Sequence, residues 1–460
     1  MMSRPALAFA PIAALVSIWL FWPGIATFDT VAQYGQVLSG AYDDWHPPMM
    51  ARWWRLIAPL GPGATPMLVL QLGMYWLGLG LIGAALARTG RPRAGAVVLG
   101  IGLWPVFLGW QGVVLKDAQM VGALLAATGL VGWWRLRGRT VPVVAVIGAG
   151  MLIGYATAVR ANAVFATMPL VMALLPGWSL RRRITGAVLA IGAVLVLAPV
   201  VNHRLLGAAS SGVERTEAIY DLAGIAVRAV PGDRHVGLNA VEAREVARSE
   251  CSRAYFWDPL GEPARCDATV ERLRRVPVGA LYATLGDAVL HHPFAYAAHR
   301  LRHLNSTGRW LVPWRWPGAS PPSRSEPNDL GLGAPGWAAR TWQGLAAWLV
   351  ETPAGWPIFW VVLAATGLAI AARGSLAAAL FVSTLAQEAS FAVLSIASDL
   401  RYHLWAMIAT ALGLVLLAEE RSWGRAGRVG GAVLAVAVIA GLVARAILPL
   451  PPQTYAGMLG

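Results

Sequence analysis

Long apolar runs constrain this chain more than any motif it contains. Of its 460 residues, 57% are hydrophobic and 13% are charged, a balance that soluble globular proteins do not have. Several runs approach the roughly 20 residues that a helix needs to cross a bilayer, and they lack the alternation of a β-barrel. The sequence therefore predicts an all-α polytopic membrane protein with about eleven transmembrane helices, at 6–23, 66–87, 95–109, 118–134, 141–159, 163–178, 185–201, 354–372, 375–397, 404–418 and 429–448.

The positions of the arginines predict the orientation of these helices. Arginines follow the second, fourth, sixth, eighth and tenth runs, and basic loops of this kind stay in the cytoplasm. Most acidic residues fall on the opposite side, apart from Glu388 within the ninth run and the pair Glu419 and Glu420. We therefore expect a cytoplasmic amino terminus. The net charge of +14 then describes an arginine-rich cytoplasmic face and gives no support for a nucleic-acid partner.

The apolar runs divide the chain into three predicted parts. Residues 1–201 form an N-terminal transmembrane module with a first exported loop at 26–65, residues 202–340 form an exported soluble segment, and residues 341–460 form a C-terminal transmembrane module. Both cysteines, Cys251 and Cys266, lie in the exported segment, where an oxidising compartment permits a disulfide. Two free thiols are the alternative, and the spacing gives no zinc signature.

Polar residues cluster at the ends of the runs on the exported side. A bundle that brings these ends together gathers them into one pocket at the membrane surface, where each charge needs a partner or a ligand. The candidate site residues are Asp29, His46, Lys116, Asp117, Arg160, Asn162, Asp221, Arg401, Tyr402 and His403.

Two acidic positions are the candidate catalytic groups. Asp29 directly follows the first run, where its carboxylate can act as a general base, although it can equally cap the helix that follows. Asp117 follows Lys116, the only lysine in the chain. An ammonium group binds phosphate as a point charge, and Asp117 beside it can serve as a second carboxylate. A salt bridge at the start of a helix is the alternative for this pair.

The remaining candidates favour anion binding. Arg160, close to Asn162, interrupts an apolar stretch on the exported side, which suggests phosphate binding or, alternatively, snorkelling to lipid headgroups. The polar turn 398–403 offers Arg401, Tyr402 and His403 for the same purpose, with a simple interfacial turn as its alternative. His46 precedes two prolines that stiffen its loop, so its imidazole can face a metal or a substrate or have a structural role.

Four histidines in the exported segment carry a weaker signal. His291 and His292 adjoin each other, and His299 and His303 lie four residues apart on an expected amphipathic helix. Their spacing, with no nearby carboxylate triad, favours a helix that packs against the membrane surface or within a domain over a metal site.

The order of these motifs resembles that of the GT-C superfamily of membrane glycosyltransferases, which use polyprenyl-phosphate sugars and include the protein O-mannosyltransferase and aminoarabinose-transferase branches. An acid after the first span, a His-Pro-Pro element in the same loop, an Asp opening the fourth span and a basic residue near the fifth-to-sixth turn correspond to Asp29, His46, Asp117 and Arg160. The resemblance covers the first 200 residues or so, and the remainder matches in layout alone.

This resemblance implies a function on the exported face of a bacterial inner membrane. Asp29 would be the catalytic base or orient the acceptor, Asp117 would assist, and Lys116, Arg160 or Arg401 would hold the lipid phosphate. The implied partners are a polyprenyl-phosphate sugar donor, a cell-envelope acceptor and the bilayer, and the transfer would invert the anomeric centre. Many members carry paired Asp-Glu where this chain has Asp29 followed by Thr30, so a divalent metal cofactor is left open.

Two other functional classes are compatible with the same residues. In a transporter or flippase for a lipid-linked or anionic solute, the cations would line a path, and Glu388 is the clearest polar residue at depth. A non-catalytic scaffold for envelope assembly is the third class, and the pocket-forming charges disfavour it.

Overall fold

The regular secondary structure of the described residues is helical. A computed structural model describes residues 3–262, 265–418 and 423–459, so that Glu419, Glu420 and Arg421 of the expected charge pattern lie outside the described residues. Within these ranges the extended segments meet only in isolated β-bridges, and no longer strand forms. The all-α prediction is therefore confirmed.

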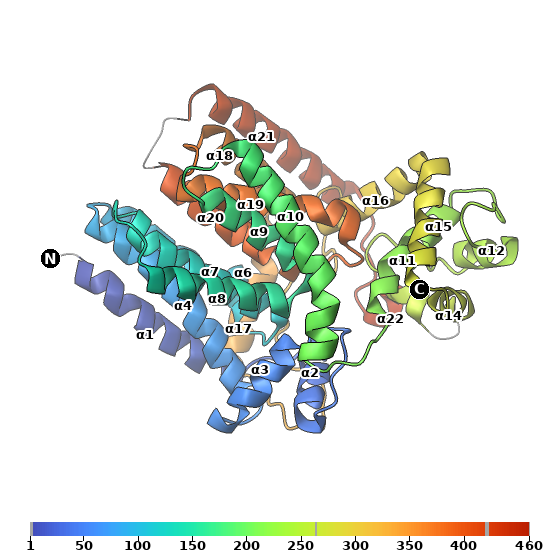
Figure 1. The fold of residues 1–460 in the computed structure, drawn as a ribbon, viewed down its shortest axis with the longest axis horizontal. Coiled ribbons are helices and arrows are strands. Elements are labelled where there is room, and N and C mark those ends of the chain that lie inside the picture. Colours follow the sequence, from blue (N-terminus) through green and yellow to red (C-terminus); the bar gives the residue numbers. More distant parts are fainter. Residues whose placement is uncertain (1–2, 263–264, 419–422, 460) are drawn as a thin grey trace. The chain divides into compact units, whose positions relative to one another are not determined.

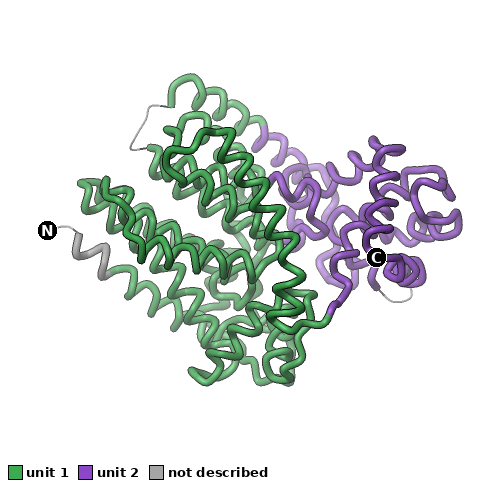
Figure 2. The backbone as a smooth tube through the Cα atoms, in the orientation of Figure 1, with its two compact units in different colours: residues 1–209, 319–388, 400–436 green, residues 210–318, 389–399, 437–460 purple. Residues whose placement is uncertain are grey.

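The helices belong to two compact units (Figure 2). Unit 1 contains residues 1–209, 319–388 and 400–436, and unit 2 contains residues 210–318, 389–399 and 437–460. Helices α19 and α21 each contribute residues to both units. The predicted three-part organisation is a division by membrane topology, whereas these units are defined by packing, so that organisation stays a prediction.

Unit 1 holds the apolar helices and the short helices between them. Its elements are α1 (Ser3–Phe21), α2 (Phe28–Ser39), α3 (Met49–Ile57), α4 (Thr65–Arg88), α5 (Pro92–Gly102), α6 (Pro105–Gln111), α7 (Lys116–Arg135), α8 (Val143–Val159), α9 (Val164–Leu174), α10 (Leu180–Pro199), α17 (Trp337–Leu349), α18 (Pro357–Ile370), α20 (Leu404–Ala418) and the first parts of α19 (Leu376–Leu394) and α21 (Gly424–Ile447). Every predicted transmembrane run coincides with helix, α5 and α6 together covering the third run.

The number of helices that can cross a membrane is smaller than the number of predicted runs. Within the described ranges, five segments are long and apolar enough, namely Thr65–Arg88, Leu180–Leu205, Leu376–Leu394, Leu400–Ala418 and Gly424–Ile447. Helices α5 and α6, bent by 54° at their junction, add a sixth if they form one span. The others are shorter apolar helices or, like α7, less apolar along their length. The apolar helices are thus consistent with a membrane protein, and the count of about eleven is not confirmed.

Helix α10 gives the most direct physical reason to expect a membrane. It continues into a π-helical turn to Leu205, and none of its residues is buried within the protein. Leu189 and Val196 are 68% and 75% exposed. In water, so long an apolar surface would be unfavourable at roughly 25 cal/mol per Å², whereas lipid chains would cover it without that cost.

Helices α1, α4 and α7 lie side by side in unit 1 (Figure 1). The contact between α4 and α7 requires glycine, because a Cβ atom on Gly78 would lie 2.2 Å from the backbone of Leu125. Gly129 faces Gly78 in the same way, with 2.7 Å between its would-be Cβ and the Cα of Gly78. Small residues of this kind allow helices in a membrane to approach closely. This packing fixes the position of α7, whose first residue is Lys116.

Unit 2 is a smaller helical body with its own core. It contains α11 (Thr216–Ala226), α12 (Ala240–Arg248), α13 (Asp258–Gly261), α14 (Asp267–Arg274), α15 (Val278–His291), α16 (Pro293–Thr307), α22 (Tyr455–Leu459) and the remaining parts of α19 and α21. Ile219, Leu222 and Val246 are buried in this core, as are Cys251 and Cys266. The two cysteines form a disulfide, as predicted.

Removal of this disulfide should destabilise unit 2. The bond joins residues 15 positions apart, and closing a loop of about this length in the unfolded chain is worth roughly 3 kcal/mol. We expect the double variant Cys251→Ala/Cys266→Ala to unfold at a lower temperature than the wild type in detergent micelles. Wild type treated with reductant should unfold like the variant. Alkylation of both cysteines in denatured, unreduced wild type would contradict the assignment.

Candidate functional site

A short pairing of extended backbone brings the ends of two distant segments together. Ile25 forms a parallel bridge with Val113, in which the Ile25 N–H donates to the carbonyl of Gly112 at 3.1 Å and the Val114 N–H donates to the carbonyl of Ile25 at 2.9 Å. The buried hydroxyl of Thr30 adds a bond to the Val114 carbonyl at 2.7 Å. Because α2 and α7 begin just after these segments, Asp29 and Lys116 meet.

Buried amide side chains hold the segment before Lys116 in place. Gln71 Nε2 donates to the carbonyls of Gln111 and Val113 at 2.6 and 2.9 Å. These carbonyl groups lie at and beyond the end of α6, where helix geometry provides no hydrogen-bond donor for them. Gln119 Nε2 donates to Gln71 Oε1 at 3.0 Å, and the Tyr155 hydroxyl donates to Gln119 Oε1 at 3.1 Å. These residues are not among the site residues predicted from the sequence. A glutamine within an apolar run was the available signal, because a buried amide requires partners.

Asp29 lies in the first turn of α2 and does not cap it. The helix begins at Phe28, its N-cap is Thr27, and the Thr27 N–H donates to Thr30 Oγ1 at 2.9 Å. The expectation that Asp29 could itself cap the helix is therefore wrong, and its carboxylate is available for other contacts. A negative charge in this first turn is also favoured by the helix dipole.

His46 is positioned by a second bridge and by the diproline. Asp43 pairs with Ala209, whose N–H donates to the carbonyl of Tyr42 at 2.8 Å. Pro48 is the residue before α3, so its restricted backbone sets the entry to that helix. His46 is buried between these two fixed points.

Asp29 is the centre of the site. Lys116 Nζ donates to its Oδ2 at 3.3 Å, and Arg401 Nη1 approaches the same oxygen at 3.0 Å. His46 Nε2 lies 3.5 Å from Oδ1, and Lys116 Nζ lies 2.5 Å from His46 Nδ1. Oδ2 is thus held by two cations, while Oδ1 has a longer contact with one imidazole.

The charge states of this group follow from its surroundings. Burial alone would raise the pKa of Asp29, but Lys116, Arg401 and His46 together hold it well below 3.8. Burial and then the charge of Lys116 lower the pKa of His46 from 6.5. A neutral His46 can accept from Lys116 at Nδ1 and donate from Nε2 to Asp29. With Lys116 and Arg401 protonated, the four side chains carry one net positive charge, which suits an anion.

The site is partly open. The side chains of Asp29, Lys116 and Arg401 are 15%, 12% and 13% exposed. These fractions are small enough to strengthen electrostatic interactions and large enough for a ligand to reach the polar atoms.

A second ion pair adjoins this centre. Arg160 pairs with the fully buried carboxylate of Asp117, and its Nε donates to Asn162 Oδ1 at 2.7 Å. The guanidinium lies 4.3 Å above the centre of the Tyr402 ring. Arg160 is itself buried, so the snorkelling alternative is wrong. Lys116 and Asp117 both form salt bridges at the start of α7, as the alternative for this pair expected, but their partners Asp29 and Arg160 are distant in the sequence.

The turn Leu400–His403 (η6) supplies the last predicted residues. Arg401 reaches Asp29 as described, and the carbonyl of Tyr402 accepts from Gln387 Nε2 at 2.8 Å. His403 is fully buried, and its Nδ1 lies 2.8 Å from Glu388 Oε2. Unit 1 therefore brings every predicted site residue except Asp221 into one connected group, with Glu388 as an additional member.

Asp221 has a different environment, inside unit 2. Arg300 Nη2 contacts its Oδ2 at 2.6 Å, and His299 Nε2 lies 3.2 Å from Oδ1. Burial, with the charges of Arg228 and Arg302, lowers the pKa of His299 to about 4, so this imidazole is neutral at pH 7. Asp221 thus pairs with α16 in the interior of unit 2, and the expected packing role of the helix that carries His299 agrees with this contact.

The group around Asp29 does not fit a divalent metal ion. Such an ion needs several oxygen or nitrogen ligands, with bonds of about 2.0 to 2.6 Å. Asp29 Oδ2 already accepts from two cations, and Asp117 is committed to Arg160. An ion at Asp29 would lie against Lys116 and Arg401, and the one group of potential metal ligands found among the described residues does not include Asp29.

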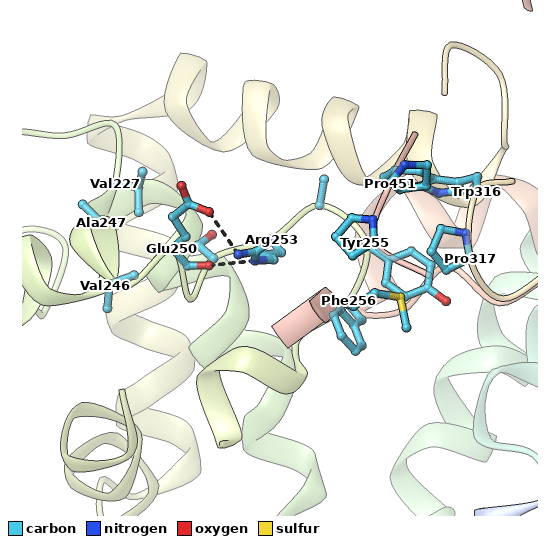
Figure 3. A pocket seen from close by; sticks show the side chains of 14 residues that line it. Val227, Val246, Ala247, Glu250, Arg253, Tyr255, Phe256, Trp316, Pro317 and Pro451 are labelled. Atoms are coloured by element: carbon cyan, nitrogen blue, oxygen red, sulfur yellow. Dashed lines mark hydrogen bonds and ion pairs between the residues drawn. The ribbon is translucent and has the colours of Figure 1, made fainter. Parts of the chain in front are cut away.

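Unit 2 contains a cavity of about 340 Å³ that no predicted site residue lines. Figure 3 shows Glu250 and Arg253 on one side and the rings of Tyr255, Phe256 and Trp316 on the other. Arg253 Nη2 donates to Glu250 Oε2 at 3.0 Å. The aromatic wall can stack on an apolar or planar group, but the cavity lacks a cluster of reactive side chains.

Comparisons with known proteins give no further guide to this site. No protein-family model matches the chain, and no curated protein matches it.

The contributions of Asp117 and Arg160 to the stability of the protein should depend strongly on each other. Removal of one partner leaves the other as an uncompensated buried charge, at a cost of roughly 3 to 5 kcal/mol. We expect Asp117→Asn and Arg160→Met each to lower the thermal unfolding midpoint in detergent, and the double variant to lose less than the sum of the two.

Exposed residues provide the matched controls. Asp329→Asn and Arg139→Met make the same chemical changes on the surface, where substitutions are usually worth less than about 0.5 kcal/mol. Strict additivity of the two buried substitutions would contradict a direct interaction between Asp117 and Arg160.

Proposed function

We propose that this chain is an inverting membrane glycosyltransferase that transfers a sugar from a polyprenyl-phosphate donor to a cell-envelope acceptor. The acceptor class is a glycan, a lipid or a protein. The resemblance to the GT-C superfamily in the order of motifs supports the proposal and implies a site on the periplasmic face of a bacterial inner membrane. The eleven spans and the cytoplasmic amino terminus are expected from the apolar runs and the arginines.

One observation carries the proposal, namely an ionised carboxylate held between two cations in a partly exposed site. Lys116 and Arg401 share Asp29 Oδ2, so the group has one positive charge in excess. An excess cation attracts a phosphate, and the carboxylate beside it can take a proton from an acceptor. Both groups are needed by a reaction in which a phosphate departs while a hydroxyl attacks.

The reaction assigns a role to each contact. The acceptor oxygen forms a bond to the anomeric carbon while the bond between that carbon and the donor phosphate oxygen breaks. The proton of the acceptor passes to Asp29, with Oδ1 as the less engaged oxygen. The bonding electron pair leaves with the phosphate, whose charge Lys116 and Arg401 stabilise. Because the phosphate is already ionised at neutral pH, it needs no strong general acid.

Asp117 acts in this scheme through Arg160. Its side chain is fully buried and pairs with the guanidinium, so it is a positioning residue for a cation near the phosphate. Asn162 and the ring of Tyr402 fix the same guanidinium from two further directions. His46 contacts both Lys116 and Asp29 and so holds their side chains next to each other.

A transporter or flippase of a lipid-linked or anionic solute is the second candidate. The pair of Glu388 and His403 favours it, because ionisable groups within membrane helices commonly line a solute or proton path. Both side chains are at least nine-tenths buried, with 9% and 0% exposed. This pair adjoins the Asp29 group through the turn Leu400–His403, so the same residues could face a donor that is bound and moved but not cleaved.

Replacement of Asp29 by asparagine should abolish turnover. Purified protein in phospholipid nanodiscs is incubated with a panel of labelled polyprenyl-phosphate sugars and candidate envelope acceptors, and release of polyprenyl phosphate is measured. We expect the wild type to consume at least one donor. Loss of a general base lowers the rate by roughly 10² to 10⁴, so the turnover rate of Asp29→Asn should be lower than that of the wild type by this factor. The rate of Asp29→Glu, which retains a carboxylate, should fall less.

The control is Asp329→Asn, which removes an exposed carboxylate from the same unit and should turn over like the wild type. A single cooperative thermal transition would establish that Asp29→Asn is folded, although the loss of a carboxylate beside Lys116 and Arg401 should lower its midpoint. Wild-type turnover by Asp29→Asn would remove Asp29 from its assigned role. Donor binding without consumption by the wild type, together with movement of donor between leaflets of a vesicle, would favour the flippase.

A further inference from the structure

We propose that His235, Asp287 and His291 form a binding site for a transition-metal ion such as Zn²⁺ on unit 2. Asp287 and His291 lie four residues apart on α15, so they share one face of that helix. His235 comes from the loop before α12. The site is separate from the Asp29 group and does not depend on the proposed glycosyl transfer.

The three side chains already converge on one point. His235 Nδ1 lies 2.7 Å from Asp287 Oδ2, and His291 Nδ1 lies 3.2 Å from Asp287 Oδ1. The two imidazole rings are stacked, with 3.6 Å between their centres and 15° between their planes. One ligand atom from each residue can be chosen so that all lie within 4.8 Å of one another.

These separations are close to those of a tetrahedral site. Zinc binds imidazole nitrogen and carboxylate oxygen at about 2.0 to 2.2 Å, which puts neighbouring ligand atoms about 3.3 Å apart. Imidazole binds a metal through a lone pair in the ring plane, so at least one of the two stacked rings has to rotate about its side-chain bonds before both nitrogens point at the ion. Two imidazoles and one carboxylate are also a chemically suitable set for zinc and similar ions.

Contacts of a neighbouring carboxylate hold His235, the ligand from the loop, against α15. The Asp233 carboxylate accepts from the backbone N–H of His235 at 2.9 Å and lies 3.4 Å from His292 Nε2. His292 directly follows α15, so Asp233 ties the loop to the end of the helix. Supporting hydrogen bonds of this kind orient metal ligands. Three of the eight histidines of the chain gather here.

The protonation of His235 is compatible with metal binding. Arg234 Nε donates to His235 Nε2 at 3.1 Å, so the ring proton is on Nδ1 and faces Asp287. A metal ion at Nδ1 replaces that proton, which passes to solvent. The Asp287 and His291 side chains are 49% and 48% exposed, so water can occupy the fourth position.

The competing explanation is a hydrogen-bonded His-Asp-His group that fastens the loop without any ion. The sequence predicted packing over metal binding for His291 because no carboxylate triad accompanies the histidines. Asp287 and Asp233 now supply carboxylates from within the fold, and metal binding separates the two explanations.

The test is titration of the full-length protein with Zn²⁺. The protein is purified in detergent, freed of any histidine tag, treated with EDTA and dialysed, and heat is recorded as ZnCl₂ is added. We expect about one equivalent of Zn²⁺ to bind. His235→Ala, Asp287→Asn and His291→Ala should each weaken binding by at least tenfold.

His203→Ala is the matched control. His203 also contacts a carboxylate, with 3.4 Å between its Nε2 and Asp44 Oδ2, but the described residues around it provide no third ligand. Its removal should leave Zn²⁺ binding unchanged. Equal binding by the wild type and all three site variants would overturn the proposal.

A second measurement requires no variant. Co²⁺ bound to two imidazoles, a carboxylate and water in a tetrahedral site gives intense visible absorption bands, so the metal-free wild type should acquire them at one equivalent and lose them on addition of Zn²⁺. Absence of these bands together with weak, non-stoichiometric Zn²⁺ binding would favour the hydrogen-bonded group alone. Since neither readout involves donor turnover, the metal site and the proposed transfer reaction can fail independently.

Discussion

The arrangement of unit 1 around its site depends on the neutralisation of the Asp29 carboxylate inside a largely apolar body. Asp29 is held by Lys116 from the start of α7 and by Arg401 from the turn before α20. Neither an acid nor a lysine could be sequestered here alone, because burial of an unpaired charge costs several kcal/mol. The ion pairs therefore require the starts of α2, α7 and α20 to lie close together. The apolar packing elsewhere in the bundle has to be compatible with that arrangement.

Apolar packing alone would not specify this arrangement. In lipid, helices gain little from the hydrophobic effect by associating with one another, so close contact and polar bonds decide which faces meet. Gly78 and Gly129 permit close contact between α4 and α7. Gln71 and Gln119 supply the polar bonds, and these end on the extended backbone just before Lys116. The same interactions that select the helix packing thus also position the site.

Much of the helical architecture and most of the site membership could be predicted from the sequence. Apolar runs mark the helices, and Lys116 stands out as the only lysine among 37 basic residues. The partners of these residues could not be predicted, because the bridge between Ile25 and Val113 joins segments far apart in the chain. For the same reason His235 could not be linked to Asp287, 52 positions away. The alternative of Asp29 as an N-cap is wrong for a local reason, because α2 begins at Phe28 with Thr27 as its N-cap. Asp221 shares the residue type of the site but belongs to the packing of unit 2.

The two oxygens of Asp29 differ in a way that bears on the proposed chemistry. Oδ2 has two cationic neighbours within 3.3 Å, whereas Oδ1 has one imidazole at 3.5 Å. A carboxylate whose charge is fully compensated would be a poor base. Here an arriving phosphate would compete with Oδ2 for Lys116 and Arg401, and this competition would return negative charge to the carboxylate and raise its proton affinity. Donor binding would therefore activate the base in the complex where it is needed, so that a low pKa in the free protein is compatible with proton transfer in the bound state.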